Sequence, residues 1–196
     1  MKILFAVCSY LLGSVPTGYL LVRVFFKSDV RGLGSGNTGA TNVLRVKGWK
    51  TALPVALFDV LKGFLPVFLA LRRFDDPSFA ALCGLLAVVG HCFPFAIGFR
   101  GGKGMATSLG AFAALAWAPC LASLGIFLLA VGLTRFVSLG SILAALAFPI
   151  VYRLGGGPAG ATAVLFAVSA LVVFQHRSNI GRLVRGSERK LGERAS

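Results

Sequence analysis

Four polar segments of this sequence have a composition suited to holding anions. Each combines small residues, hydroxyl groups or amides with at least one cation. Glycines let the backbone point several N–H groups at one anion, and the start of a following helix adds its positive end. The pattern predicts phosphate binding. The segments are GSGNTGATNVLR (Gly34–Arg45), FRGGKGMATS (Phe99–Ser108), TRFVSLGS (Thr134–Ser141) and HRSNIGRL (His176–Leu183).

Two familiar nucleotide-binding patterns do not fit these segments. The first segment contains G-x-G-x-x-G, with Asp59 about 20 residues beyond its last glycine. That fingerprint requires a preceding strand, and the apolar run Ile3–Phe26 is too long to be one. The Walker pattern also fails, because Gly104 follows Lys103 where Ser or Thr is required. The glycines must therefore serve another kind of anion.

Metal and disulfide chemistry find little support in the sequence. The few acidic residues are scattered, so we expect cations and N–H donors to neutralise a phosphate, with neither a metal ion nor a cofactor. The acids are Asp29, Asp59, Asp75, Asp76, Glu188 and Glu193. The cysteines lie in apolar runs without a C-x-x-C pair, which favours packing roles. They are Cys8, Cys83, Cys92 and Cys120.

The composition places the polar segments in a membrane protein. The 196 residues are 57% hydrophobic and only 13% charged, whereas a soluble domain carries about 25% charged residues. We expect one integral membrane domain over residues 1–196. The net charge of +14 then reflects membrane topology and anionic substrates rather than nucleic acid.

The apolar runs predict an all-α polytopic fold with about seven transmembrane helices. A span needs about 20 apolar residues. The run Thr107–Thr134 is too long for one span, and Pro119 favours a division there. Five spans remain possible if two of the segments are re-entrant. The seven segments are Ile3–Phe26, Thr51–Leu71, Ser78–Phe99, Thr107–Ala118, Pro119–Thr134, Val137–Tyr152 and Ala159–Phe174.

The distribution of basic residues predicts the orientation. Seven spans would place fourteen Lys and Arg residues on one side and four on the other. Since cytoplasmic loops are enriched in these residues, we expect the N-terminus outside and a basic cytoplasmic tail over about residues 176–196. All four polar segments then lie on the cytoplasmic side. One such segment could be a simple turn with a cationic anchor, but four together favour a binding site.

Three long motifs resemble a known family. SGNTGATNVLR, GHCFPFAIGFRGGKGMAT and HRSNIGRLVRGSE are similar to the signature segments of the bacterial acyl-phosphate:glycerol-3-phosphate acyltransferases. The resemblance extends from near Gly13 to Glu188. Thr38 stands where the family commonly has proline, and Gln175 where a basic residue often precedes the histidine.

The resemblance implies a reaction and a location. An acyl group would pass from acyl phosphate to the 1-hydroxyl of glycerol 3-phosphate, giving lysophosphatidate and phosphate for phospholipid synthesis. It implies a seven-helix fold in the bacterial inner membrane, with the active site on the cytoplasmic side. Because acyl phosphate is already activated, the enzyme must mainly hold two dianions together and stabilise the oxyanion.

The resemblance also assigns site residues. Lys103, His176 and Ser35 would be catalytic. The glycerol phosphate would be held by Arg45, Lys103, Ser141, His176 and Asn179. Donors to the acyl phosphate and the oxyanion would come from Ser35, Gly36, Asn37, Gly39, Thr41 and Asn42, together with the loop Gly101, Gly102, Lys103, Gly104 and Thr107.

Some roles stay open at this point. The hydroxyl proton could pass to His176 or to a substrate phosphate. His91 reads as a packing residue near Pro94, and Asp59 with Lys62 as a buried i, i+3 pair that supports the loops. A lipid-open groove for the acyl chain is expected but cannot be localised. The competing functions are a transporter of a phosphorylated metabolite, which needs polar residues through the membrane depth, and a membrane scaffold with a lipid-binding tail.

Overall fold

The computed structural model describes residues 1–193, and all regular structure in that part is helical. The first apolar run is a broken span: α1 (Lys2–Gly13) and α2 (Thr17–Phe26) are separated by a short break. Pro16 lies in that break, and a proline cannot continue the hydrogen-bonding pattern of the preceding helix. The sequence predicted a single segment over Ile3–Phe26, so the interruption is a finding of the structure.

The next elements form a cap at one end of the bundle and then two long helices. The short helices η1 (Val30–Gly32) and α3 (Ala40–Lys47) follow α2. Helix α4 (Trp49–Phe74) runs the length of the molecule, and α5 (Pro77–Cys92) returns beside it. A turn of 3-10 helix, η2 (Phe95–Ile97), leads into the glycine-rich loop.

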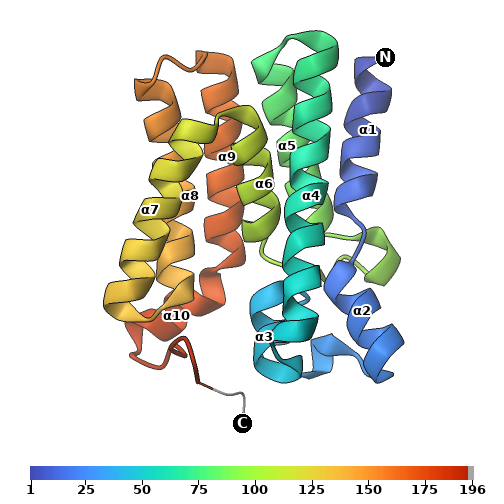
Figure 1. Ribbon diagram of the computed structural model, residues 1–196, viewed down its shortest axis with the longest axis vertical. Helices are drawn as coiled ribbons and strands as arrows, with labels where there is room; N and C mark the ends of the chain where they lie inside the picture. The colour runs from blue at the N-terminus through green and yellow to red at the C-terminus, as the bar shows by residue number, and fades with distance from the viewer. Residues whose placement is uncertain (194–196) are drawn as a thin grey trace.

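The second half of the chain supplies the other side of the bundle. It contains α6 (Met105–Leu115), α7 (Trp117–Thr134), α8 (Val137–Leu154) and α9 (Ala159–Gln175). Helix α9 is followed by α10 (Arg177–Val184) across a bend of 57°. Figure 1 shows α3, α10 and the C-terminus at one end of the bundle and the N-terminus at the other.

Fewer helices than the predicted seven are long and apolar enough to span a membrane. Five segments are long and apolar enough to span, or six if the bent pair α9–α10 is one span. Helix α6 has only 11 residues, or about 16 Å at 1.5 Å per residue. It was predicted as a span over Thr107–Ala118. In Figure 1 it starts within the bundle and rises toward the end that carries the N-terminus, but stops short of it.

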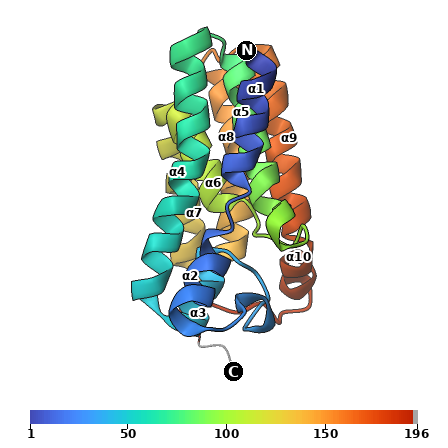
Figure 2. The same ribbon diagram turned by 90° about the vertical axis from the view of Figure 1, so that its right-hand side faces the viewer.

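Glycines bring α4 and α6 into close contact at the centre of the bundle (Figure 2). A Cβ atom on Gly63 of α4 would lie 1.9 Å from the carbonyl oxygen of Thr107, and one on Gly110 of α6 would lie 1.9 Å from that of Val60. Small residues allow such backbone approach in membrane helices. Because α6 is fixed against α4 in this way, its first turn is fixed relative to the polar segments.

Candidate active site

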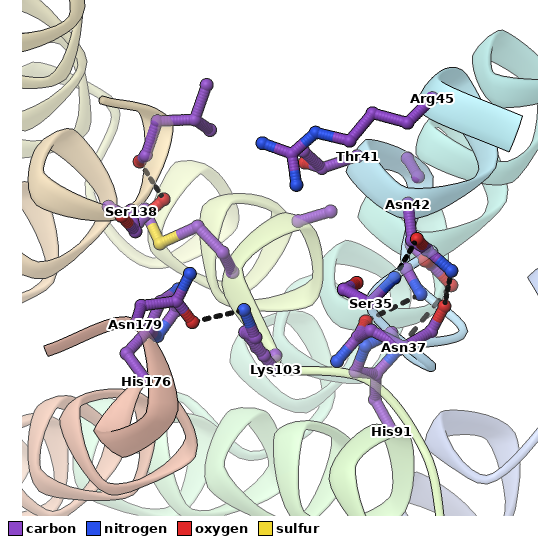
Figure 3. A pocket seen from close by; sticks show the side chains of 18 of the residues that line it. Ser35, Asn37, Thr41, Asn42, Arg45, His91, Lys103, Ser138, His176 and Asn179 are labelled. Carbon is purple, nitrogen blue, oxygen red and sulfur yellow. Dashed lines mark hydrogen bonds and ion pairs between the residues drawn. The ribbon is translucent and has the colours of Figure 1, made fainter. Parts of the chain in front are cut away.

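The four polar segments meet in one cavity at the α3–α10 end of the bundle (Figure 3). Its volume is about 100 Å³. Eleven residues that the sequence proposed for the site line this cavity: Ser35, Asn37, Gly39, Thr41, Asn42, Arg45, Lys103, Gly104, Ser141, His176 and Asn179. The segments are far apart in the chain, so the fold brings together what the sequence could only list.

The first loop is held in shape by its own amides. Asn42 Oδ1 accepts from the backbone N–H of Ser35 at 2.9 Å, and its Nδ2 donates to the carbonyls of Leu33 and Asn37 at 3.0 and 2.8 Å. Asn37 Oδ1 accepts from Gly39 N–H at 2.8 Å. Asn42 therefore shapes the loop instead of offering its amide to a ligand.

The same loop is packed closely against α2. A Cβ on Gly18 would lie 1.9 Å from the carbonyl oxygen of Thr38, and Thr38 itself is buried. Gly34 and Gly36 adopt positive φ values of 59° and 71°, which favour glycine. The departure from proline at position 38 is thus accommodated in a buried, closely packed turn.

The glycine-rich loop uses two of its amides to close the end of α5. Gly101 N–H donates to Cys92 O at 3.1 Å, and Gly102 N–H donates to His91 O at 3.0 Å. These two N–H groups were expected to face a phosphate, but they bind the last carbonyls of a helix, which need partners. Gly104, with φ of 81°, then caps α6, and the residues Gly104, Met105 and Ala106 line the cavity.

Thr107 does not line the cavity, contrary to expectation. Its side chain is fully buried, and its carbonyl packs against Gly63 of α4. Thr107 therefore lies in the α4–α6 interface and not in the cavity wall.

Lys103 is a half-buried cation of the site. Its Nζ donates to Asn179 Oδ1, and burial lowers its pKa to about 8. Glu188 raises this pKa, whereas Arg182 and Arg45 lower it. The neutral amide partner leaves the charge of Lys103 available to an anionic ligand.

Arg45 points into the same cavity from α3 (Figure 3). Within residues 1–193, no hydrogen bond or ion pair engages its guanidinium group. Burial lowers its pKa, but an arginine stays protonated at neutral pH. It is therefore a second cation free to bind an anion.

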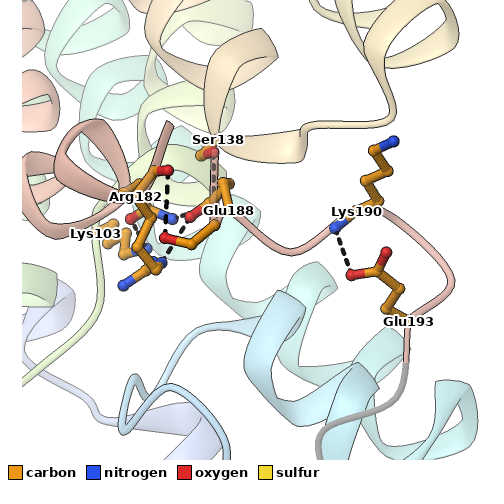
Figure 4. Close-up of polar contacts among 8 residues, drawn as sticks. Lys103, Ser138, Arg182, Glu188, Lys190 and Glu193 are labelled. Atoms are coloured by element: carbon orange, nitrogen blue, oxygen red, sulfur yellow. Dashed lines mark hydrogen bonds and ion pairs between the residues drawn. The ribbon is translucent and has the colours of Figure 1, made fainter. Parts of the chain in front are cut away.

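Glu188 is a site residue that the sequence did not identify. Its carboxylate accepts from Ser138 Oγ at 2.7 Å, Asn179 Nδ2 at 2.6 Å and Arg182 Nε at 2.7 Å (Figure 4). Burial opposes its ionisation, but these hydrogen bonds keep its pKa below the usual value. By binding the NH₂ group of Asn179, Glu188 turns the Asn179 oxygen toward Lys103. The only available signal was an acid within a basic tail.

His176 lies where α9 bends into α10. Its Nδ1 is 2.7 Å from the carbonyl oxygen of Val172. Because a carbonyl only accepts, Nδ1 carries the hydrogen and Nε2 of the neutral ring is left as an acceptor. Ser141 lines the cavity from α8, with its hydroxyl donating to Val137 O at 2.9 Å.

A second polar cavity of about 300 Å³ adjoins the first. Ser35, Asn37 and Lys103 line both. The three remaining glycines that the sequence proposed, Gly36, Gly101 and Gly102, line this second cavity. It is also lined by cationic and polar side chains from the glycine-rich loop, the end of α9 and α10: Arg100, Gln175, Arg177, Ser178 and Arg182.

An apolar groove of about 240 Å³ opens beside the first cavity. Residues of α6 line it, together with Ala56 of α4 and with Leu124 and Phe127 of α7. Six residues line both the groove and the first cavity: Ala40, Thr41, Met105, Ala106, Val137 and Ser141. A ligand with a polar head and an apolar chain could occupy both.

A buried ion pair lies beneath the cavity. Lys62 Nζ is 2.8 Å from Asp59 Oδ1, as the i, i+3 spacing predicted. Thr17 Oγ1 donates to the same oxygen at 2.7 Å, and His91 Nδ1 lies 3.5 Å from it. His91 and Asp59 both line the cavity, so His91 does more than pack near Pro94.

The sequence matches the family described as "Glycerol-3-phosphate acyltransferase" over residues 3–186. A protein of that name from Synechococcus sp. (strain CC9902) is 45% identical over 193 residues, which cover 98% of this chain and 96% of the relative. Another, from Brucella anthropi, is 44% identical over 187 residues, which cover 95% of this chain and 91% of the relative.

Two solved structures share the fold. Both are crystal structures of PlsY (YgiH), described as an integral membrane glycerol 3-phosphate acyltransferase. The glycerol 3-phosphate form has a TM-score of 0.94 and 36% identity, covering 97% of this chain and 96% of that one. The lysophosphatidic acid form has a TM-score of 0.90 and 36% identity, covering 97% and 95%. The chain therefore belongs to the glycerol-3-phosphate acyltransferase family and is an integral membrane acyltransferase of the PlsY type.

Proposed function

We propose that this enzyme transfers an acyl group from acyl phosphate to the 1-hydroxyl of glycerol 3-phosphate, releasing lysophosphatidate and phosphate. The observation that carries the proposal is the continuity of three spaces: two polar cavities share Ser35, Asn37 and Lys103, and the first opens into an apolar groove. The two polar cavities would take the two phosphates, and the groove would take the acyl chain.

The glycerol phosphate belongs in the first cavity. Arg45 and Lys103 offer positive charge there without a carboxylate as direct partner, and His176, Asn179 and Ser141 complete the lining. Charge-assisted hydrogen bonds from such groups are the strong ones. The related PlsY structure that contains glycerol 3-phosphate supports a site of this kind.

The acyl phosphate belongs across the boundary between the two cavities. Its phosphate would lie near Ser35, Asn37 and Lys103, with Gly36, Gly101 and Gly102 forming the wall of the second cavity. Its carbonyl oxygen would lie near the first turn of α6, where the amides of Gly104, Met105 and Ala106 begin the helix. Donors fixed in this way stabilise a developing oxyanion.

The acyl chain extends into the groove between α4 and α7. Its lining of Leu109, Phe112, Leu124 and Phe127 is apolar, and exposed leucines continue along the outer face of α7 at Leu121 and Leu128. A donor dissolved in the bilayer would thus reach the site from the side.

The bond changes need no nucleophile from the protein. The 1-hydroxyl oxygen attacks the carbonyl carbon, the tetrahedral oxyanion collapses, and the bond from that carbon to the phosphate oxygen breaks. The hydroxyl proton passes either to Nε2 of His176 or to a phosphate oxygen. His176→Gln separates the two routes: loss of most of the turnover assigns the base to the protein, and retention assigns it to the substrate.

The proposed location is the bacterial inner membrane, with the α3–α10 end facing the cytoplasm. The excess of Lys and Arg in the segments at that end supports this orientation. Glycerol 3-phosphate, a soluble dianion, would then approach from the cytoplasm.

The test is purified protein in lipid vesicles, supplied with glycerol 3-phosphate and either an acyl phosphate or the matching coenzyme A thioester. We expect lysophosphatidate and phosphate in equal amounts with the acyl phosphate, and no product with the thioester. Lys103→Met is the control for contaminating enzymes. Equal product from both donors, or intact acyl phosphate beside active thioester turnover, would contradict the proposed donor.

A further inference from the structure

Beneath the glycine-rich loop, one buried carboxylate joins three separate elements. Asp59 of α4 pairs with Lys62, whose Nζ also donates to Val15 O in the α1–α2 break at 2.9 Å. Thr17 donates to Asp59 from the start of α2, and His91 of α5 lies beside it. Asp59, Lys62 and His91 are all at most 6% exposed.

The ion pair adds no net charge to the anion-binding cavity. Asp59 alone would repel a phosphate, and Lys62 offsets it at 2.8 Å. Either charge buried singly in a membrane helix would be costly. We therefore expect the neutral Asp59–Lys62 pair to act by fixing the position of its neighbours, among them the His91 ring.

The imidazole ring of His91 lies against Gly102. A Cβ on Gly102 would lie 1.9 Å from His91 Nε2, 2.7 Å from its Cε1 and 2.9 Å from its Cδ2. The ring thus occupies the space that a side chain at Gly102 would need. Gly101 differs, because its Cβ would meet the backbone oxygen of His91 at 2.1 Å and the ring of Pro94 at 2.5 Å.

Gly102 is held on its other sides as well. Its N–H donates to His91 O at 3.0 Å, and its carbonyl accepts from Gln175 Nε2 at 3.2 Å. Lys103 is the next residue, so these contacts of Gly102 also fix the backbone position from which the Lys103 side chain enters the cavity. The family motif commonly has a basic residue at position 175. Here Gln175 stands there, and its hydrogen bond to Gly102 O supports the loop.

We propose that His91, held beside Asp59, is a positioning residue that sets the place of Lys103 through Gly102. The inference rests on the proposed function of Lys103 in binding the substrate phosphates. In this proposal His91 acts on the glycine-rich loop and not on the reacting atoms. Its ring supports the glycine loop, and the Asp59–Lys62 pair fixes the ring relative to α2 and α4.

The test is a double-mutant cycle between positions 91 and 102. Gly102→Ala places a methyl group against the ring, so we expect KM for the anionic substrates to rise at least about tenfold. His91→Asn keeps an N–H near Asp59 but removes Nε2 and Cε1. In the double variant the methyl group has room, so kcat/KM should exceed that of Gly102→Ala alone, and the two effects should be strongly non-additive.

Gly101→Ala provides the matched control. Its methyl group would meet backbone and proline atoms, so His91→Asn should give it no rescue. Additive effects at 91 and 102, or equal rescue at 101 and 102, would overturn the proposal. KM and kcat are measured separately on variants with unchanged unfolding temperature, because a merely structural defect would lower the amount of active enzyme without raising KM.

Two further measurements keep the test decisive. If His91→Asn is not recovered folded, His91→Ala with Gly102→Ala gives the same comparison, and additivity there counts equally against the proposal. The wild-type activity with acyl phosphate tests the donor on its own. The ratios between variants test His91 with whichever donor the wild-type enzyme accepts, so the two failures are distinguishable.

Discussion

The two ends of the bundle use their charges differently. At the end with the N-terminus, Lys2 Nζ pairs with Asp76 Oδ2 at 2.8 Å and lies over the rings of Phe74 and Phe79. At the α3–α10 end, the cavity cations Arg45 and Lys103 have no carboxylate as direct partner. Lys2 and Asp76 neutralise each other at the first end, whereas Arg45 and Lys103 at the second end are available to an anionic ligand. Substitutions at the two ends should therefore separate stability from activity.

The largest effect is expected from Lys103→Met. Removing a half-buried cation that lines both polar cavities should lower kcat/KM about 10³-fold, as expected for loss of a fixed electrostatic group. The unfolding temperature should not fall, because a half-buried charge without a carboxylate partner does not stabilise the fold. Steady-state kinetics and thermal unfolding on the same sample measure both. Lys2→Met is the control at the other end, and a comparable loss of activity there would break the comparison.

The next effect concerns pH. Burial places the pKa of Lys103 near 8, so the group is charged below that pH and neutral above it. Since only the charged form attracts phosphate, kcat/KM should fall about tenfold for each pH unit above 8. The substrate phosphates stay dianionic in this range, because their second pKa is about 6. Lys103→Arg, slower overall, should lose this decline, and an unchanged decline would assign it to another group.

A smaller effect is expected in the apolar groove between the two ends. Ala144 of α8 lines it and is buried. Ala144→Leu should lower kcat/KM for a long-chain acyl phosphate about fivefold, at the low end of overpacking costs of about 1–3 kcal/mol. A short-chain donor should be less affected. Leu143→Ala, on the exposed face of the same helix, is the control. An equal loss for both chain lengths would argue against the groove.

The smallest effect on activity is expected from Asp76→Ala. Asp76 Oδ1 accepts from the backbone N–H groups of Ser78 and Phe79 and so caps α5. Its loss should lower the unfolding temperature and leave kcat/KM unchanged. Thermal unfolding in detergent, with kinetics on the same sample, checks this. A change in kcat/KM without a change in unfolding temperature would contradict the division between the ends.

Hydropathy anticipated the helical class, local composition the polar segments, and the family resemblance most of the residues that line the cavity. They could not anticipate the directions of individual groups. The N–H groups of Gly101 and Gly102 close α5, and Thr107 faces α4, because backbone contacts decide both. Glu188 was missed because the tail folds back over α8 and α10, a tertiary contact with no local pattern.

The helix count shows the same limit. The segment after Gly104 is apolar enough to suggest a span, but α6 has only 11 residues and starts inside the bundle. Its length depends on where the glycine loop enters, and that depends on the end of α5. The break between α1 and α2 at Pro16 was likewise invisible to hydropathy, since both halves are apolar.

The first cavity has two openings that differ in polarity. One is the apolar groove between α4 and α7, and the other is the polar opening at the α3–α10 end. A third polar cavity, lined by Arg45, Arg182 and Arg189 among others, shares residues with the first cavity and lies at that polar opening. Under the proposed chemistry, acyl phosphate and lysophosphatidate enter and leave through the groove. Glycerol 3-phosphate and phosphate enter and leave through the polar opening. Because the two routes are separate, turnover does not require the site to open alternately to the two sides of the membrane, as a transporter's site must.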